Sequence, residues 1–399
     1  MKCTKAEEAY LRCIIMQTRK LYYEDCHMQT FTATVTGCTQ TAKGWEVTLD
    51  ATAFYPEGGG QPSDVGTLGT ARVLDVRERG EEVIHLCDSA LEAGSTVEGS
   101  IDWERRFDFM QQHTGEHILS GLIHQKYGFH NVGFHMGKQA MEVDFDGPIP
   151  PEELMELERK ANEAIWRNLE VKHWYPEPEA LKQVTYRSKK ELPWPVRIVQ
   201  VPGYDSCACC GVHVARTGEV GIIKILSGVK FHQGIRLEVL CGRRAYEFLG
   251  AVYDQNRLVS QAFSAKVLQT GEAAQRMNEQ LSGEKLRAAS LEKKLFAMIA
   301  QEYRDAGDVV RFEENLAPGA VRELADAIAA ECGGVAAIFS GSDENGYSMC
   351  LLGDAARVKE LGSGLCKALG GRGGGKPGSF QGSVKAGRER IEKLFAENV

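Results

Sequence analysis

The chain has 399 residues, of which 43% are hydrophobic and 26% are charged, and its formal net charge is -8. This length predicts two or three domains of ordinary globular composition. Acidic residues stand where a secretory signal would need an apolar core, and no run approaches the ~20 apolar residues of a membrane span. We therefore expect a cytoplasmic protein without membrane contact, whose 12 cysteines are mostly reduced thiols.

Residues 1–19 are expected to be an N-terminal extension, and residues 20–102 a small β-barrel domain. Short β-type runs separated by turn residues occur at 32–36, 45–49, 71–74 and 83–86. Within this domain the loop from Glu57 to Gly66 contains three consecutive glycines, which would let backbone N–H groups approach a ligand, followed by Gln61, which offers a donor and an acceptor. The alternative is a hairpin turn whose glycines only satisfy positive φ.

Residues 103–245 are predicted to form a mixed α/β domain that holds a metal site. Helices are expected at 103–128 and 151–169, and strands at 196–201 and 221–240. His113 and His117 are four residues apart, so on a helix their side chains lie on one face and can bind one cation. Cys209 and His213 would complete a tetrahedral set of the kind zinc accepts.

The residues alone leave the metal site open in two respects. A zinc protease motif is excluded, because it requires Glu directly after the first histidine and this chain has Thr114. Cys207 and Cys210 compete with Cys209 as the thiolate ligand, and spacing does not choose among them.

A helical segment is expected at 246–303. Between residues 267 and 298 the apolar residues follow alternating three- and four-residue steps, interrupted by Glu284, which predicts a heptad seam: Ala274, Met277, Leu281, Ala288, Leu291, Leu295 and Met298. Two interpretations remain, an amphipathic helix packed on its own domain and a coiled coil that makes a homodimer.

The last segment, residues 304–399, is expected to be a small α/β domain. Apolar runs and a helix alternate at 335–339, 347–352 and 355–369. From Arg357 to Val399 nine Lys and Arg occur with four Glu, so this region is locally basic. Its glycine cluster is not a nucleotide-hydrolysing loop, because Lys376 is followed by proline. Exposed backbone amides beside two cations suit the backbone of an RNA, so these residues are predicted to contact tRNA: Gly371, Arg372, Gly373, Gly374, Gly375 and Lys376. The alternative is that the cluster is a flexible surface turn.

Three motifs in order carry a family resemblance: the segment from Phe54 to Gly66, the His113/His117 pair and the Cys209/His213 pair. Together they resemble the editing domain of alanyl-tRNA synthetase and its freestanding AlaX-type relatives over about residues 20–245. The glycine cluster is similar to the signature of the DHHA1 domain, which ends both the synthetase and the long AlaX form. Residues 1–15 lie outside the resemblance, so Met16 is a candidate start.

The resemblance implies one zinc ion per chain, bound by His113, His117, Cys209 and His213. The family often has Cys-Gly-Gly-Thr-His where this chain has Cys-Cys-Gly-Val-His, so ligation by Cys210 stays open. It further implies an editing pocket that includes Gln61 with Gly59 and Gly60. Thr52 matches a threonine that in the family can bond the hydroxyl of a serine side chain.

The implied activity is a zinc-dependent aminoacyl-tRNA hydrolase that acts in trans on tRNA(Ala), removing serine and also glycine in translation quality control. Zinc would either lower the pKa of a water or hold the substrate, and four protein ligands favour the second role. The Gly-rich loop would stabilise oxyanion charge. One alternative is a zinc-stabilised tRNA-binding protein without catalysis. Another is a fragment of a synthetase, but we expect no aminoacylation core, because there is no room for one before residue 20.

Overall fold

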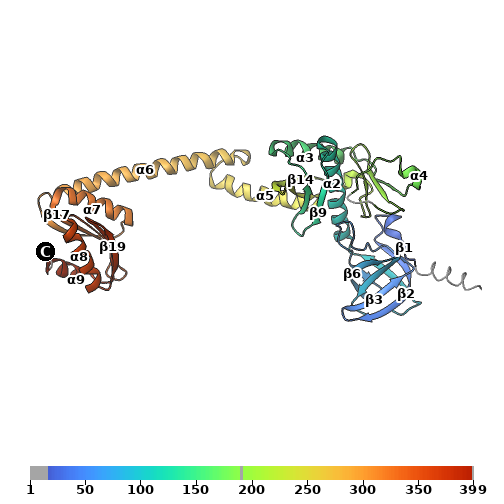
Figure 1. The fold of residues 1–399 in the computed structure, drawn as a ribbon, viewed down its shortest axis with the longest axis horizontal. Coiled ribbons are helices and arrows are strands. Elements are labelled where there is room, and N and C mark those ends of the chain that lie inside the picture. The colour runs from blue at the N-terminus through green and yellow to red at the C-terminus, as the bar shows by residue number, and fades with distance from the viewer. Residues whose placement is uncertain (1–16, 189–191, 398–399) are drawn as a thin grey trace, which may run out of the picture. The chain divides into compact units, whose positions relative to one another are not determined.

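The computed structural model describes residues 17–188 and 192–397, which divide into two compact units, one up to Asn256 and one from Arg257 (Figure 1). Most of the expected N-terminal extension, residues 1–16, lies outside the described residues. No helix among the described residues is long and apolar enough to cross a membrane. The finer division into five segments stays a prediction.

The first unit begins with a β domain. Six strands are hydrogen-bonded in the order β2-β3-β7-β6-β5-β8 and close into a barrel. They are β2 (Thr30–Thr41), β3 (Gly44–Leu49), β5 (Gly66–Leu68), β6 (Ala71–Arg79), β7 (Glu82–Cys87) and β8 (Thr96–Ile101). Alternate residues point inward, as in β2, where Phe31, Ala33 and Val35 are buried. Outside the barrel, β1 (Arg19–Lys20) pairs with β4 (Ala51–Thr52), and η1 (Leu21–Tyr23) follows β1.

The rest of the first unit surrounds one long helix, α2 (Trp103–Tyr127). The Asp102 side chain accepts a hydrogen bond from the Arg105 N–H at its start, and Gly128 ends it with a φ of 73°. Unlike an ordinary surface helix, α2 is buried on most sides, so its sequence has little amphipathic pattern: sixteen of its 25 residues are buried. It therefore presents side chains to the interior.

Two sheets, the helix α3 and the short helix η2 pack around α2 (Figure 1). The larger sheet has the order β14-β15-β10-β9, and the smaller has the order β11-β12-β13. Their strands are β9 (Asn131–Met136), β10 (Met141–Phe145), β11 (Lys172–Trp174), β12 (Ile198–Val201), β13 (Asp205–Ala208), β14 (Ile223–Phe231) and β15 (Gly234–Cys241). The helices are α3 (Pro151–Trp166), α4 (Pro178–Leu181) and η2 (Thr217–Val220), and α5 (Gly242–Ala262) closes the unit. The mixed α/β prediction is confirmed, although α3 ends three residues before the expected Leu169.

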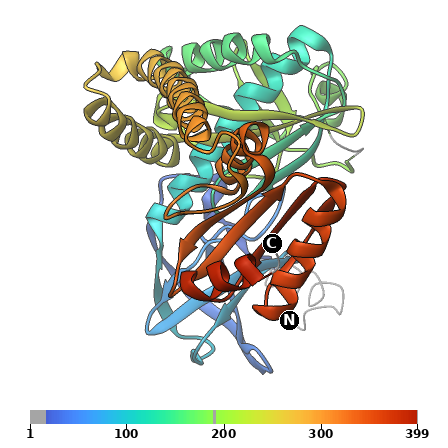
Figure 2. The same cartoon turned by 90° about the vertical axis from the view of Figure 1, so that its left-hand side faces the viewer.

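The second unit contains a five-stranded sheet in the order β16-β17-β18-β20-β19. Its strands are β16 (Gly307–Glu313), β17 (Gly333–Ser342), β18 (Gly346–Leu352), β19 (Arg372–Lys376) and β20 (Ser379–Val384). Helices cover both faces (Figure 2): α7 (Pro318–Cys332) on one, α8 (Ala355–Ala368) and α9 (Arg388–Glu397) on the other. Ala336 and Ile338 pack with α7, while Val335 and Phe339 pack with α8 and α9. The expected small α/β domain is confirmed.

The glycine cluster differs from both expectations, because it is an edge strand rather than a loop or a turn. β19 pairs only with β20, and all five of its residues are exposed. A Cβ at Gly373 would lie 2.5 Å from the Phe380 ring, and one at Gly375 would lie 1.9 Å from the Ser379 carbonyl. Glycine is depleted from strands, so composition predicted a loop, whereas close packing on β20 requires it here.

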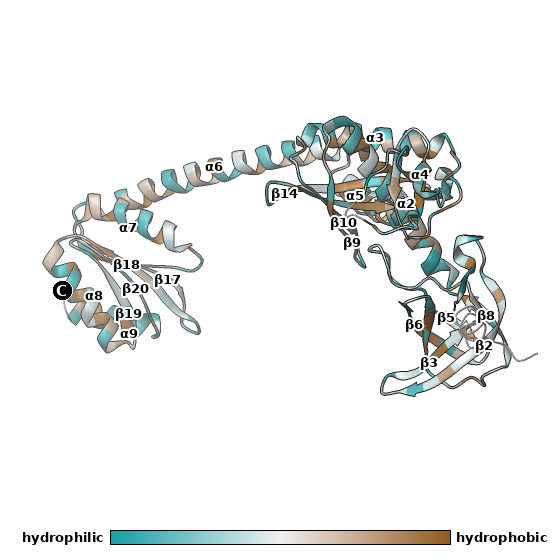
Figure 3. Ribbon diagram, turned by 45° about the vertical axis from the view of Figure 1, so that its right-hand side comes forward, coloured by the Kyte–Doolittle hydropathy of each residue, from teal (hydrophilic) through white to brown (hydrophobic). Residues whose placement is uncertain are grey.

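The expected helical segment is two helices, α5 and α6 (Thr270–Glu302), joined through η3 (Val267–Gln269). Among the described residues, α6 packs on its own unit near both ends: Ala273 is buried at the start, where α6 contacts η3, and Phe296 and Ala300 are buried beside α7. The five large seam residues are 45–68% exposed: Met277, Leu281, Leu291, Leu295 and Met298. Apolar and polar turns alternate along the helix in Figure 3. Packing within the described chain therefore accounts for the two ends of α6 and leaves the large seam residues between them exposed.

A buried ion pair joins the barrel to α2. The guanidinium of Arg106, on α2, donates to the carboxylate of Asp64, and both side chains are at most 1% exposed. Arg106 also donates to the Ala53 carbonyl, and Asp64 accepts the Tyr55 N–H at 2.6 Å. The segment on either side of the Gly-rich loop is thereby attached to the helix that carries the histidines.

Replacing Arg106 by methionine should destabilise the protein by about 3–5 kcal/mol, because Asp64 would remain buried without its cation. Urea unfolding followed by tryptophan fluorescence measures the loss. The matched control is Lys182→Met, which removes a pair with Glu179 in which both side chains are more than two-thirds exposed, and should leave the midpoint unchanged. Equal midpoints for the Arg106 variant and the parent would contradict the role given to this pair.

Candidate metal centre and its cleft

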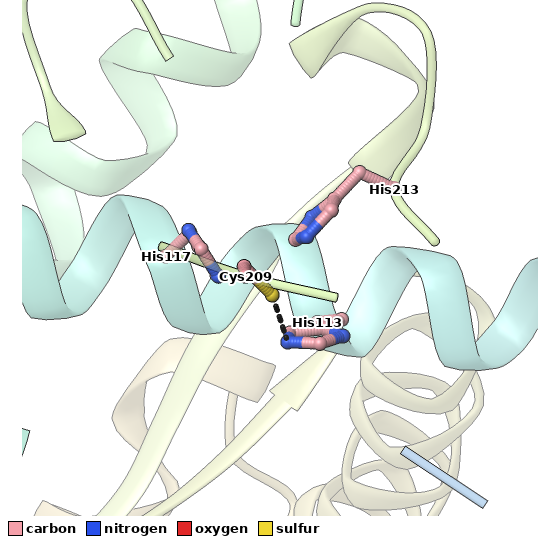
Figure 4. A group of neighbouring side chains, drawn as sticks. All are labelled: His113, His117, Cys209 and His213. Atoms are coloured by element: carbon pink, nitrogen blue, oxygen red, sulfur yellow. Dashed lines mark hydrogen bonds between the residues drawn. The ribbon is translucent and has the colours of Figure 1, made fainter. Parts of the chain in front are cut away.

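Four side chains from two segments meet at one point. α2 supplies His113 and His117, and the loop that follows β13 supplies Cys209 and His213. The possible ligand atoms all lie within 4.8 Å of one another, and the three histidines are at most 5% exposed. Figure 4 shows the imidazoles and the thiol directed toward a common centre, with the Cys209 sulfur 3.5 Å from Nε2 of His113. The structure thus brings together all four residues predicted as ligands.

Each histidine is held from behind at its Nδ1 atom. For His113 the partner is Oε1 of Gln61, which lies 2.9 Å away, and for His117 it is a carboxylate oxygen of Asp205, which lies at an ion-pair distance of 2.9 Å. For His213 it is the Thr114 hydroxyl at 3.2 Å. Partners of this kind fix the ring and leave Nε2 for a metal.

The tautomer of His113 follows from the Gln61 oxygen. The Val212 N–H donates to that same oxygen at 3.2 Å, so the oxygen is an acceptor and Nδ1 of His113 must carry its proton. Nε2 of His113 is then the unprotonated nitrogen, which is the form that binds a metal.

The protonation states of the cluster also suit a metal. Burial would raise the pKa of the Cys209 thiol, but His113 and His117 outweigh burial and hold that pKa well below its usual value, so a thiolate is favoured. Burial lowers the pKa of His213 well below its usual value, which keeps the ring neutral. Nε2 of His213 is buried and has no hydrogen-bond partner in the described part of the chain. A cation bonded to this nitrogen would relieve that unsatisfied acceptor.

The two competing cysteines are less suitable ligands. Burial raises the pKa of Cys207 to about 11, and burial also raises the pKa of Cys210. Cys207 groups with Asp205 and His117 rather than with the other two histidines. Asp205 is itself bound by the Arg187 guanidinium at 2.7 and 2.8 Å, so its carboxylate is already neutralised. The geometry therefore favours Cys209.

The loop of Cys209 is held by two side chains from outside it. One guanidinium nitrogen of Arg197 donates to the carbonyls of Cys209 and Gly211, at 3.0 and 2.9 Å. The Tyr23 hydroxyl donates to the Cys210 carbonyl between them at 2.6 Å, and the guanidinium stacks 4.3 Å from the Tyr23 ring. The Gly211 N–H in turn donates to the Cys209 sulfur at 3.3 Å. Three successive carbonyls are thus fixed, which orients the thiolate.

The Gly-rich loop is a tight hairpin at the edge of a cleft. Gly58 and Gln61 exchange backbone hydrogen bonds of 3.1 and 2.9 Å, and the two residues between them have φ of 59° and 84°, as a type I′ turn requires. A Cβ on Gly60 would lie 2.6 Å from the Phe134 ring. The loop is therefore a hairpin, and its glycines do more than satisfy positive φ, because Gly59 and Gly60 also line the cleft.

Two other predicted site residues lie behind the surface of the cleft. Neither Gln61 nor Thr52 occurs among the described residues that line it, and both are completely buried. Thr52 contacts Nε2 of His85 at 2.8 Å and accepts the Phe54 N–H at 3.1 Å. The structure places Gln61 beside the metal cluster and Thr52 inside the barrel.

The cleft has a volume of about 1310 Å³ and reaches the metal cluster. His113, His117 and Cys209 belong to its lining. Glu116, which sequence analysis did not select, also lines it, and Ser120 and Asn131 donate to one of its carboxylate oxygens at 2.5 Å each. The position of Glu116 between the two histidines of the motif was the sequence signal that could have identified it. The sequence carries no such signal for Asp205 and Arg197, because only the fold brings these residues to the cluster.

The predicted RNA-contact residues, from Gly371 to Lys376, belong to the second unit. Gly371 precedes β19, on which the residues from Arg372 to Lys376 are exposed together with one backbone edge.

Three sequence families match parts of the chain. The family described as the threonyl and alanyl tRNA synthetase second additional domain matches residues 196–237, which include Cys209 and His213. The family of class II (A) tRNA synthetases matches residues 3–105, and the DHHA1 domain matches residues 305–397. The match that begins at residue 3 corrects the expectation that residues 1–15 lie outside the resemblance.

Individual proteins are similar over most of the chain. The alanyl-tRNA editing proteins Aarsd1 of Danio rerio and Mus musculus are 28% and 29% identical to it, over 94% and 93% of this chain and 96% and 95% of their own lengths. The alanine–tRNA ligase of Pyrococcus abyssi is 30% identical over 95% of this chain, which covers 43% of that enzyme.

Proposed function

We propose that this chain, which is similar to the alanyl-tRNA editing proteins, hydrolyses the ester of mischarged Ser-tRNA(Ala), and also of Gly-tRNA(Ala), as a trans-editing enzyme of the cytoplasm. One observation carries the proposal: a buried cluster of three imidazoles and one thiolate lies at an open cleft in the unit that matches the synthetase family. The cleft is large enough for the end of a charged tRNA rather than for an amino acid alone.

We propose zinc, one ion per chain, as the cofactor of this cluster, because three nitrogens and one thiolate are a common set for that ion. When bound, zinc supplies a fixed positive charge that can hold the substrate's amino or carbonyl group. The chain supplies the ligands, the contacts at Nδ1 that orient them, and the exclusion of water from the buried side.

In the reaction a water oxygen adds to the ester carbonyl carbon and the bond to the ribose oxygen breaks. That oxygen takes a proton, and the amino acid leaves as its carboxylate. Backbone amides of Gly59 and Gly60, at the cleft surface, are the proposed donors to the developing oxyanion. Selection of serine through Thr52 requires that the substrate hydroxyl reach a side chain that is completely buried in the barrel and already bonded to His85 and Phe54.

The second candidate is a zinc-stabilised tRNA-binding protein without catalysis. Side-by-side incubation with Ser-tRNA(Ala), Gly-tRNA(Ala) and Ala-tRNA(Ala) separates the two candidates. Faster loss of serine or glycine than of alanine supports the enzyme. Binding of tRNA without hydrolysis of any of the three supports the binding protein.

Cys209→Ala should lose the zinc, because the thiolate is the only anionic donor of the cluster. Metal analysis of the purified variant, with circular dichroism to check its fold, measures the loss. Cys210→Ala is the matched control and should keep one zinc per chain. Zinc retained in the Cys209 variant and lost in the Cys210 variant would transfer the ligand role to Cys210.

Gln61→Ala should slow single-turnover deacylation of Ser-tRNA(Ala) by about 10- to 100-fold, because His113 loses the acceptor that fixes its tautomer. Binding of tRNA should change little, since Gln61 is buried behind the cleft. A variant with the parent's rate would remove Gln61 from the mechanism.

The complementary variant changes Arg372 and Lys376 on β19 to alanine. It should weaken tRNA binding, while deacylation at saturating tRNA persists. The slope of the logarithm of the binding constant against the logarithm of the salt concentration should become smaller by about one for each lost phosphate contact. Equal salt slopes for variant and parent would show that β19 does not contact the RNA.

We also propose that the α6 seam joins two copies of the chain, because its large apolar residues are exposed and follow heptad spacing on either side of Glu284. Leu291→Asp should convert a dimer to a monomer in light scattering, since it would place an unpaired charge in the interface. Leu286→Asp is the control, because Leu286 is 74% exposed and lies off the seam. A parent protein that is monomeric at micromolar concentration would contradict the proposal.

A further inference from the structure

We propose that Trp194 and Tyr175 form a stacking surface for the terminal nucleobase of the RNA, in the same cleft as the metal cluster. The inference rests on the proposed function, which places the reacting ester on the terminal ribose. It adds a binding site for a nucleoside, formed by residues that no motif of the sequence marked.

The first argument is the exposure of these two rings. Trp194 is 55% exposed and Tyr175 is 52% exposed, although both line a cleft. Large aromatic side chains are usually buried, and exposed ones gathered at a concave surface indicate a ligand. Leu192 and Pro193, which precede Trp194 in the chain, line the same cleft and add apolar residues to its lining.

The second argument is that Trp194 is already oriented. Its indole N–H donates to the Pro176 carbonyl at 3.2 Å, which holds the ring while more than half of the residue stays accessible. Pro176 follows Tyr175 directly, so this bond also connects the two aromatic residues. A stacking surface that is ordered before binding loses less entropy when the base docks.

The third argument is a guanidinium in the lining of the same cleft. Arg197 is 8% exposed and lines the cleft together with Tyr175 and Trp194. The guanidinium donates to the carbonyls of Cys209 and Gly211 and stacks on the Tyr23 ring, so its position is fixed. A fixed cation in the lining can attract an oxygen of the ribose or of its phosphate.

The size and chemistry of the cleft agree with a nucleoside rather than a free amino acid. Its volume of about 1310 Å³ exceeds the roughly 300–1000 Å³ typical of a drug-sized ligand. Arg19 and Lys20 also line it, and their carboxylate partners, Glu24 and Glu78, are surface groups that a phosphate can replace. Aromatic rings bind any base through its π-face, and cations accompany them in single-stranded RNA sites.

The test compares tRNA(Ala) that ends in its terminal adenosine with the same tRNA lacking that one nucleotide. Binding to the full-length, zinc-loaded protein is measured for the parent and for Trp194→Ala. The variant should bind the complete tRNA about 10-fold more weakly and the shortened tRNA equally well, because only the complete molecule carries the stacked base. Trp194→Phe should keep most of the parent's preference for the complete tRNA over the shortened one, since phenylalanine retains an aromatic ring.

Trp166→Ala is the matched control. Trp166 is 72% exposed at the end of α3 and does not occur among the described residues lining the cleft, so its loss should affect both tRNAs equally or not at all. Zinc content and circular dichroism of each variant show that the metal centre and the fold are retained.

The two proposals fail in different ways. The stacking surface is overturned if the parent binds both tRNAs equally, or if Trp194→Ala keeps the parent's preference for the complete tRNA. If that preference depends on Trp194 but the parent hydrolyses none of the three charged tRNAs, the stacking surface stands and the proposed editing activity falls.

Discussion

The metal cluster depends on the buried ion pair between Asp64 and Arg106. Two histidines alone would be a common coincidence on a helix, and a glycine-rich hairpin alone would be an ordinary turn. The ion pair attaches the segment that contains the hairpin to the helix that contains the histidines. An unpaired charge at that depth costs several kcal/mol, so the two segments have a single favourable arrangement. Gln61 can therefore reach His113 across the boundary between the barrel and α2.

The contacts behind the ligands explain how one centre is assembled from distant segments. Gln61 comes from the barrel, Asp205 from β13 and Thr114 from α2 itself, and each holds one imidazole at Nδ1. Arg197 and Tyr23 fix the loop of Cys209 in the same way, through its carbonyl groups. The cluster is thus oriented before any ligand arrives, which is what a site needs to bind a metal and place a substrate with little rearrangement.

The second unit follows a different principle. Its sheet is covered on both faces, so β17 is apolar along nearly its whole length rather than alternating. Its edge is β19, where glycines allow close contact with β20 while Arg372 and Lys376 remain at the surface. Charged residues on an edge strand oppose pairing with another sheet, so this edge suits an anionic partner better than a strand of another protein.

The sequence alone predicted the helix from Trp103 to Tyr127, three elements of the last domain and the pair of histidines on one helix face, and the family resemblance added the choice of Cys209 as their partner. These features are local: side-chain periods of two and 3.6 residues, capping residues and the spacing of donors are written into neighbouring positions. The tertiary structure alone decided what stands behind and beside the ligands. Asp205, Arg197 and Tyr23 carry no motif, and Trp194 is an isolated aromatic residue in a loop. The glycine cluster became a strand because β20 supplies a partner for its backbone, and hydrogen bonding between distant segments overrides the weak local preference of glycine.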